Sequence, residues 1–131
     1  MVVLDPFTYE SAWLLDTAGR ILLTFAEADC RTCFLVTASE DEAREFLGPW
    51  GKELLVFIDP DREVVKAIGL TELPAFVHID IRHVIEGKAE GWQPNEWREV
   101  AAHLATVMSW KRPEIPMPND PNPFPGSAAL G

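Results

Sequence analysis

The chain has few cysteines, few basic residues and no long apolar stretch. It contains only two cysteines among 131 residues, and they lie too close together to cross-link distant parts of a fold, so no disulfide framework is expected. No apolar run approaches the roughly 20 residues that a membrane-spanning helix needs. A chain of this length is expected to form one domain with a real hydrophobic core and no covalent staples.

The shortage of basic residues gives the chain a strong negative charge. Its 11 Lys and Arg residues face 21 Asp and Glu residues, for a net charge of −10. A charge of this sign repels phosphate backbones and argues against nucleic-acid binding. Residues 1–6 lack the basic region and following apolar region of a secretory signal. We therefore expect a cytoplasmic protein that binds neither nucleic acid nor membrane.

The two cysteines form a Cys-x-x-Cys motif, Cys30 to Cys33. Residues 20–25 (RILLTF) are a near-continuous apolar run, which predicts a buried strand ahead of the motif. Residues 34–47 carry apolar side chains at roughly helical spacing, so the motif is predicted to open a helix. Free N–H groups and the dipole at a helix N-terminus favour a thiolate on the first cysteine.

A second interpretation of this region stays open. Ser39 followed by Glu42 is a capping-box pattern, which marks the start of a helix. Residues 33–37 (CFLVT) are then themselves a strand, and the helix begins only at Ser39. Under that interpretation the sulfurs do not cap a helix.

The rest of the chain alternates helices and strands. A first helix is predicted over residues 7–16, closed by Gly19. The further predicted elements are strands over residues 53–59, 75–79 and 83–86, the last two paired as a hairpin, a short helix between Pro60 and Gly69, and an amphipathic last helix from Pro94. This order predicts an α/β layered fold over residues 1–111.

Residues 112–131 form a proline-rich C-terminal tail. Six prolines in the nineteen residues from Pro113 exclude a helix or a central strand, so the tail is predicted to be extended. It is either a disordered end or an arm that docks on a partner through Ile115, Met117 and Phe124.

Three features together resemble the thioredoxin family. They are the Cys-x-x-Cys motif after a predicted strand, the block from Ile68 through Gly69 to Leu73 and Pro74, and Gly91 before the last helix. The resemblance covers roughly residues 7–110. It implies a thioredoxin-like three-layer sandwich, with a central mixed sheet and helices on both faces.

The resemblance also implies a site. Cys30 would be the nucleophile and Cys33 the buried resolving thiol. The peptide bond between Leu73 and Pro74 would be cis and face the disulfide, leaving the Leu73 backbone free to pair with an extended substrate segment. The residues predicted to contact substrate are Leu73, Pro74, Trp92, Arg31 and Thr32.

The sequence departs from the family pattern near the motif. Asp29 stands where the family usually has Trp before the first cysteine. The buried acid of the family falls at Thr24, and its lysine partner falls in the apolar stretch around Leu55. Threonine is no base near neutral pH, so we expect weak or narrow exchange chemistry.

Two functions follow from these features. The first is a thiol–disulfide oxidoreductase that acts on protein disulfides through Cys30 and Cys33, with no metal and no organic cofactor. The alternative is a non-catalytic binding module or accessory subunit that holds a partner protein with its acidic surface and C-terminal arm. His78, His83 and His103 show no ligand spacing with the cysteines, so a metal site is not expected.

Overall fold

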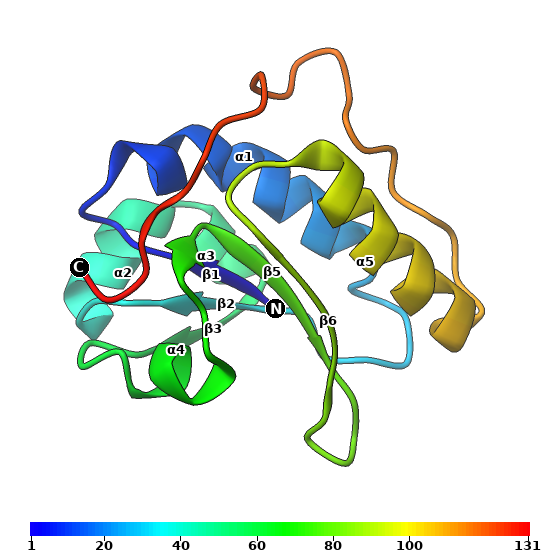
Figure 1. The fold of residues 1–131 in the computed structure, drawn as a ribbon, viewed down its shortest axis with the longest axis horizontal. Coiled ribbons are helices and arrows are strands. Elements are labelled where there is room, and N and C mark those ends of the chain that lie inside the picture. The colour runs from blue at the N-terminus through cyan, green and yellow to red at the C-terminus, as the bar shows by residue number, and fades with distance from the viewer.

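The computed structural model describes all of residues 1–131 as a mixed α/β fold built on a five-stranded sheet (Figure 1). Its strands are β1 (Val2–Leu4), β2 (Cys33–Val36), β3 (Leu55–Ile58), β5 (Ala75–Ile79) and β6 (Ile85–Glu90). The strand order is β3-β2-β1-β5-β6, in which β1, β2 and β3 are parallel and β5 and β6 are antiparallel to their neighbours. The predicted α/β class and mixed central sheet are confirmed.

Helices pack on both faces of this sheet. They are α1 (Tyr9–Thr24), α2 (Glu40–Leu47), α3 (Trp50–Glu53), α4 (Glu63–Ile68) and α5 (Pro94–Met108). Alternate residues of β1 point to opposite faces: Val2 and Leu4 join a 22-residue core with α1, α2 and α5, whereas Val3 joins an 8-residue core with α4. None of the helices is both long and apolar enough to cross a membrane.

The prediction of a strand over residues 20–25 is wrong, because residues 20–24 lie in the second half of α1 and Phe25 is its C-cap. The buried side chains of that helix recur every three or four positions, at Leu14, Ala18, Ile21, Leu22 and Phe25. Gly19 does not stop the helix. A Cβ at Gly19 would lie 2.6 Å from the Trp50 ring, so this glycine makes room for a neighbouring side chain.

The prediction that the cysteine motif opens a helix is also wrong. Cys33 is the first residue of β2, which lies between β1 and β3 and is buried along its length. α2 begins only after Ser39, whose hydroxyl accepts from the Glu42 N–H while the Glu42 carboxylate accepts from the Ser39 N–H. The second interpretation, a strand followed by a capped helix, is therefore confirmed.

The proline-rich tail is extended, as predicted, and lies against the chain's own domain. It runs back from the end of α5 and passes beside α1 (orange to red in Figure 1), and near its end the Ala129 carbonyl accepts from Arg62, the residue that precedes α4. Near its end, β7 (Ser127–Ala128) pairs antiparallel with β4 (Glu72–Leu73) to form a second, two-stranded sheet. The tail thus joins the fold instead of projecting from it.

Candidate functional site

The cysteines and the Leu73–Pro74 peptide bond lie at opposite ends of the sheet. Cys33 precedes Phe34, the partner of Val2, and therefore lies at the amino-terminal end of β1. Pro74 precedes Ala75, the partner of Val3, and lies at the carboxyl end of β1. Strand geometry separates Cys33 from Pro74 by about 10 Å along the strands and about 10 Å across them. The predicted site, in which the thiols face this proline, does not form.

The surroundings of the thiols disfavour thiolates. The Cys30 Sγ lies 3.8 Å from the Phe25 carbonyl oxygen, and Cys33 is only 7% exposed. Burial raises the pKa of both thiols above its ordinary value. Both cysteines are free, and no helix begins at either of them. The expected activation by a helix N-terminus is therefore wrong.

The other predicted contact residues divide between the two ends of the sheet. Arg31 is exposed and Thr32 nearly buried beside the cysteines, so neither lies next to the peptide bond of Leu73. That bond is cis, as predicted. Leu73 and Trp92 have no exposed surface at all. A substrate cannot reach either side chain in this conformation.

The tail occupies the backbone edge that was predicted to pair with substrate. Leu73 is the antiparallel partner of Ser127, and the Ala129 N–H donates to the Thr71 carbonyl at 2.9 Å. Farther along, Trp92 and Phe124 exchange two backbone hydrogen bonds of 2.9 and 3.0 Å. This edge is therefore already saturated by the chain itself.

Two glycines allow this close approach. A Cβ on Gly126 would lie 2.7 Å from the Leu73 carbonyl oxygen. Gly91 has a φ of +68°, and a Cβ there would lie 2.8 Å from the Gly126 backbone nitrogen. Gly91, which marked the family pattern in the sequence, thus accommodates the tail.

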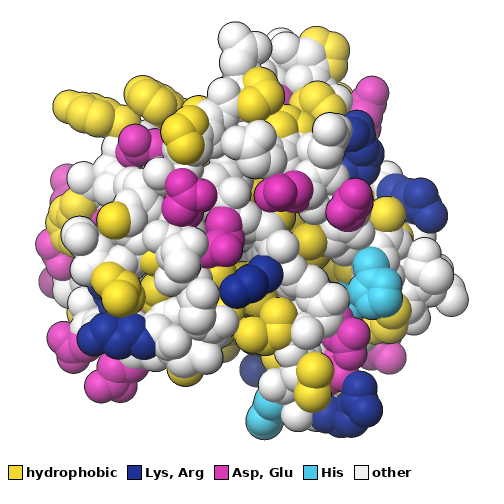
Figure 2. Space-filling view, viewed as in Figure 1, with side chains coloured by type: hydrophobic (Ala, Val, Ile, Leu, Met, Phe, Trp, Pro, Cys, Tyr) yellow, Lys and Arg dark blue, Asp and Glu magenta, His cyan; other side chains and the backbone are white.

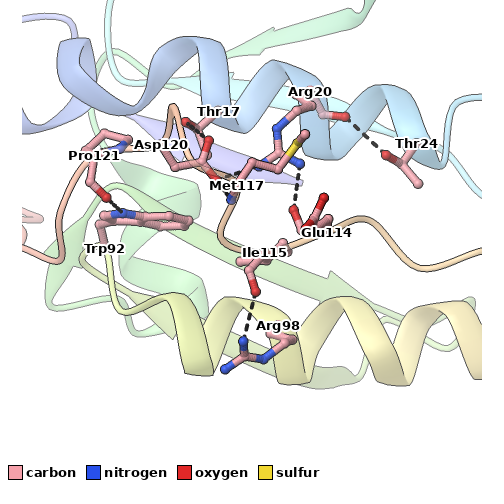
Figure 3. Close-up of polar contacts among 10 residues, drawn as sticks. All are labelled: Thr17, Arg20, Thr24, Trp92, Arg98, Glu114, Ile115, Met117, Asp120 and Pro121. Atoms are coloured by element: carbon pink, nitrogen blue, oxygen red, sulfur yellow. Dashed lines mark hydrogen bonds and ion pairs between the residues drawn. The ribbon is translucent and has the colours of Figure 1, made fainter.

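Polar contacts fasten the tail between α1 and α5 (Figure 3). The Asp120 carboxylate, with its side chain only 6% exposed, accepts from the Arg20 guanidinium at 2.6 Å and the Thr17 hydroxyl at 2.8 Å. The Trp92 Nε1–H donates to the Pro121 carbonyl at 2.8 Å. Arg98 donates to the Ile115 carbonyl at 2.9 Å.

A further ion pair holds the end of the tail. The Arg62 guanidinium donates to the buried Asp5 carboxylate at 2.9 Å and to the Ala129 carbonyl at 2.6 Å. Asp5 follows β1 directly, at the same end of the sheet as Pro74. The sequence shows no local sign of this contact, because Arg62 and Ala129 are 67 residues apart.

Exposed aromatic rings surround the start of α1 beside the tail. Phe7, Tyr9 and Trp13 are 64%, 78% and 57% exposed, and Trp13 makes an edge contact of 5.5 Å between ring centroids with Phe124 of the tail. We call these four residues the aromatic surface; Figure 2 shows hydrophobic side chains projecting on that side. Sequence reasoning placed Trp13 in a helix and missed its exposure, although Tyr9 and Trp13 lie four apart, away from the buried stripe.

No group of three His, Cys, Asp or Glu side chains converges closely enough to hold a metal ion. A scan against models of known protein families and a search of curated proteins both find no match for this chain. Its function must therefore be inferred from its own residues and their geometry.

Proposed function

We propose that the chain is a thioredoxin-like module that binds a partner protein and does not catalyse thiol–disulfide exchange. The fold assignment is supported by the parallel unit of β1, α1 and β2, followed by the antiparallel pair of β5 and β6 and the closing helix α5. It is also supported by the cis bond before β5 and by Gly91 before α5.

In this topology the segment that enters a helix next to Pro74 is residues 5–8 (DPFT), between β1 and α1. This segment takes the position at which the resemblance places the cysteine motif, and it contains no cysteine. Exchange requires a thiolate in contact with the substrate disulfide. Cys30 and Cys33 lie at the far end of the sheet, with pKa values raised by burial.

The observation that carries the proposal is the pairing of Leu73 with Ser127. A substrate segment that needs the Leu73 backbone would first have to displace the tail and its anchors at Asp120 and Ala129. The aromatic surface beside the tail, in contrast, is open. Large aromatic side chains are enriched among the residues that dominate binding energy at protein interfaces, so we assign the partner to this surface.

Catalysis is tested with an insulin-type disulfide reduction assay. We expect the wild-type chain to accelerate the reduction no more than the Cys30→Ser and Cys33→Ser variants do. The same assay tests the oxidoreductase prediction made from the sequence. Reduction by the wild type that is lost in Cys30→Ser would overturn the non-catalytic proposal.

Binding is tested by using the full chain to isolate a partner and then measuring the affinity of the purified complex. Trp13→Ala should weaken the complex by about thirtyfold, the effect of removing an interface hot spot of about 2 kcal/mol. Ile81→Ala is the matched control, because Ile81 is 98% exposed in the turn between β5 and β6. If Trp13→Ala and Ile81→Ala bind the partner with the same affinity, the aromatic surface is not the binding site.

A further inference from the structure

A second surface, separate from the aromatic one, lies along the outer edge of β6. A cavity of about 630 Å³ opens between β6 and α5, and Pro125 of the tail also lines it. We call it the acidic groove. Its charged lining residues are Glu72, Glu86, Lys88, Glu90, Glu96 and Glu99.

The negative charges of the groove are only partly compensated by ion pairs and hydrogen bonds within the chain. Glu86 pairs with Arg82 at 3.6 Å and lies 4.0 Å from the His103 Nε2, and Glu90 accepts from the backbone N–H groups of Thr71 and Glu72. The remaining three acidic side chains, those of Glu72, Glu96 and Glu99, form no salt bridge in the structure. In Figure 2 acidic side chains gather over the area of β6 and α5, next to a histidine.

The groove also exposes an unpaired strand edge. β6 is the last strand of the sheet and pairs only with β5. The Gly91 N–H donates to the Pro74 carbonyl, so by antiparallel alternation the backbone groups of Lys88 and Glu90 point outward. The Lys88 side chain extends toward the end of α4, where its Nζ lies 3.4 Å from the Gly69 carbonyl. An edge of this kind accepts an additional strand.

His78 provides an observation independent of the acids. It lines the groove and is 8% exposed, yet its Nδ1 is buried without any hydrogen-bond partner. Its ring lies 5.6 Å from that of His103, which also lines the groove. Buried polar atoms in folded proteins nearly always have a partner, so the unpartnered nitrogen of a ring that lines the groove indicates a hydrogen-bonding group that a ligand supplies.

We propose that the acidic groove binds an extended, Arg- or Lys-rich segment of the partner protein, which adds a strand to the free edge of β6. This inference rests on the proposed function, since it names the chemistry of the segment that a binding module would hold. Pro125 in the groove is the neighbour of Phe124 in the aromatic surface, so one partner can contact both.

The test titrates the full chain with a capped peptide of four Arg-Thr repeats and follows the backbone amides of Lys88 and Glu90 by NMR. Binding should shift these amides and slow their exchange with solvent. The doubly substituted Glu96→Gln/Glu99→Gln chain should bind about fivefold more weakly, because it loses two exposed ion pairs. The matched control is Glu40→Gln/Asp41→Asn on α2, which should bind within about twofold of wild type.

Two further ligands separate strand addition from simple charge attraction. A copy of the peptide methylated at alternate backbone nitrogens cannot donate to β6, and spermine carries positive charge without a backbone. The proposal is overturned if either ligand binds as tightly as the unmethylated peptide. It is also overturned if Glu96→Gln/Glu99→Gln binds that peptide with wild-type affinity. The titration needs neither the partner nor Trp13, so its failure is distinct from a failure of the proposed function.

Discussion

Replacing Asp120 with alanine tests whether docking of the tail contributes to the stability of the folded domain. The Asp120 carboxylate accepts three hydrogen bonds, from the Arg20 guanidinium at 2.6 Å, the Met117 N–H at 2.7 Å and the Thr17 hydroxyl at 2.8 Å. Its side chain is 6% exposed, whereas that of Arg20 is 28% exposed. Removing the carboxylate therefore leaves three donors without their acceptor, of which the Thr17 hydroxyl and the Arg20 guanidinium are partly buried.

The magnitude follows from these contacts. A hydrogen bond to a charged group contributes about 1.5–3 kcal/mol, and breaking a fully buried pair costs about 3–5 kcal/mol. Arg20 keeps part of its hydration after the substitution, and the three contacts are not additive. We expect Asp120→Ala to cost about 3 kcal/mol, which corresponds to a factor on the order of a hundred in an equilibrium constant.

Two measurements read out this loss. Amide hydrogen exchange reports the tail itself, because the Phe124 N–H donates to the Trp92 carbonyl at 3.0 Å only while the tail is docked. Its exchange should accelerate by about a hundredfold. Urea unfolding reports whether the loss extends to the free energy of unfolding of the whole domain.

Asp41→Ala is the control. Asp41 also pairs with an arginine, Arg44, but their side chains are 92% and 68% exposed. An exposed pair of this kind is worth about 0.2–1 kcal/mol at most, and Asp41→Ala should leave Phe124 exchange unchanged. If Asp120→Ala alters neither Phe124 exchange nor the urea midpoint more than Asp41→Ala does, the tail is not held by these contacts.

Three further predictions concern the tail, the cysteines and β4. Gly126→Ala would place a Cβ 2.7 Å from the Leu73 carbonyl oxygen, so it should lower the free energy of unfolding by about 1–3 kcal/mol and accelerate Ala129 amide exchange. Gly51→Ala is the control, because its Cβ would meet only Leu47 at 3.8 Å, and it should change neither quantity. Burial raises the pKa of both thiols, so the alkylation rate should reach half its maximum at a pH above the ordinary thiol pKa of about 8.5. The more accessible Cys30 should react faster than the buried Cys33, and a midpoint near neutral pH would contradict these surroundings. Partial burial opposes ionisation of Glu90, but hydrogen bonds from Thr71 and Glu72 outweigh it and lower the pKa of this carboxyl. Its stabilising contribution should therefore be complete above about pH 5 and lost as the pH falls through the lowered value; urea unfolding of wild type and Glu90→Gln should differ at pH 7 and converge in acid, and a difference that persists at low pH would refute this linkage.

Elements with a strong local signal could be predicted from the sequence. The capping box of Ser39 and Glu42 marked the start of α2, and the apolar face containing Trp97 marked α5. The apolar stretches before Asp59 and after Pro74 marked β3 and β5. In each case the residues that specify the element are close together in the chain.

The error at residues 20–25 shows where local pattern fails. The five consecutive apolar or neutral side chains after Arg20 fit a buried strand as well as the inner turn of a helix. The contact that separates the two, Trp50 against Gly19, involves residues 31 positions apart. A strand over residues 20–25 implies that the cysteines stand at a helix N-terminus, and the predicted site depends on that position.

Composition and local spacing alone determined that this chain is an α/β protein with two closely spaced cysteines and an extended tail, because each of these depends on neighbouring residues. Only the tertiary structure decided where those features lie. It placed Cys33 at one end of β1 and Pro74 at the other, and it laid Ser127 on the backbone of Leu73. These positions depend on sheet register and on ion pairs such as Asp120 with Arg20, a hundred residues apart, which no local pattern encodes.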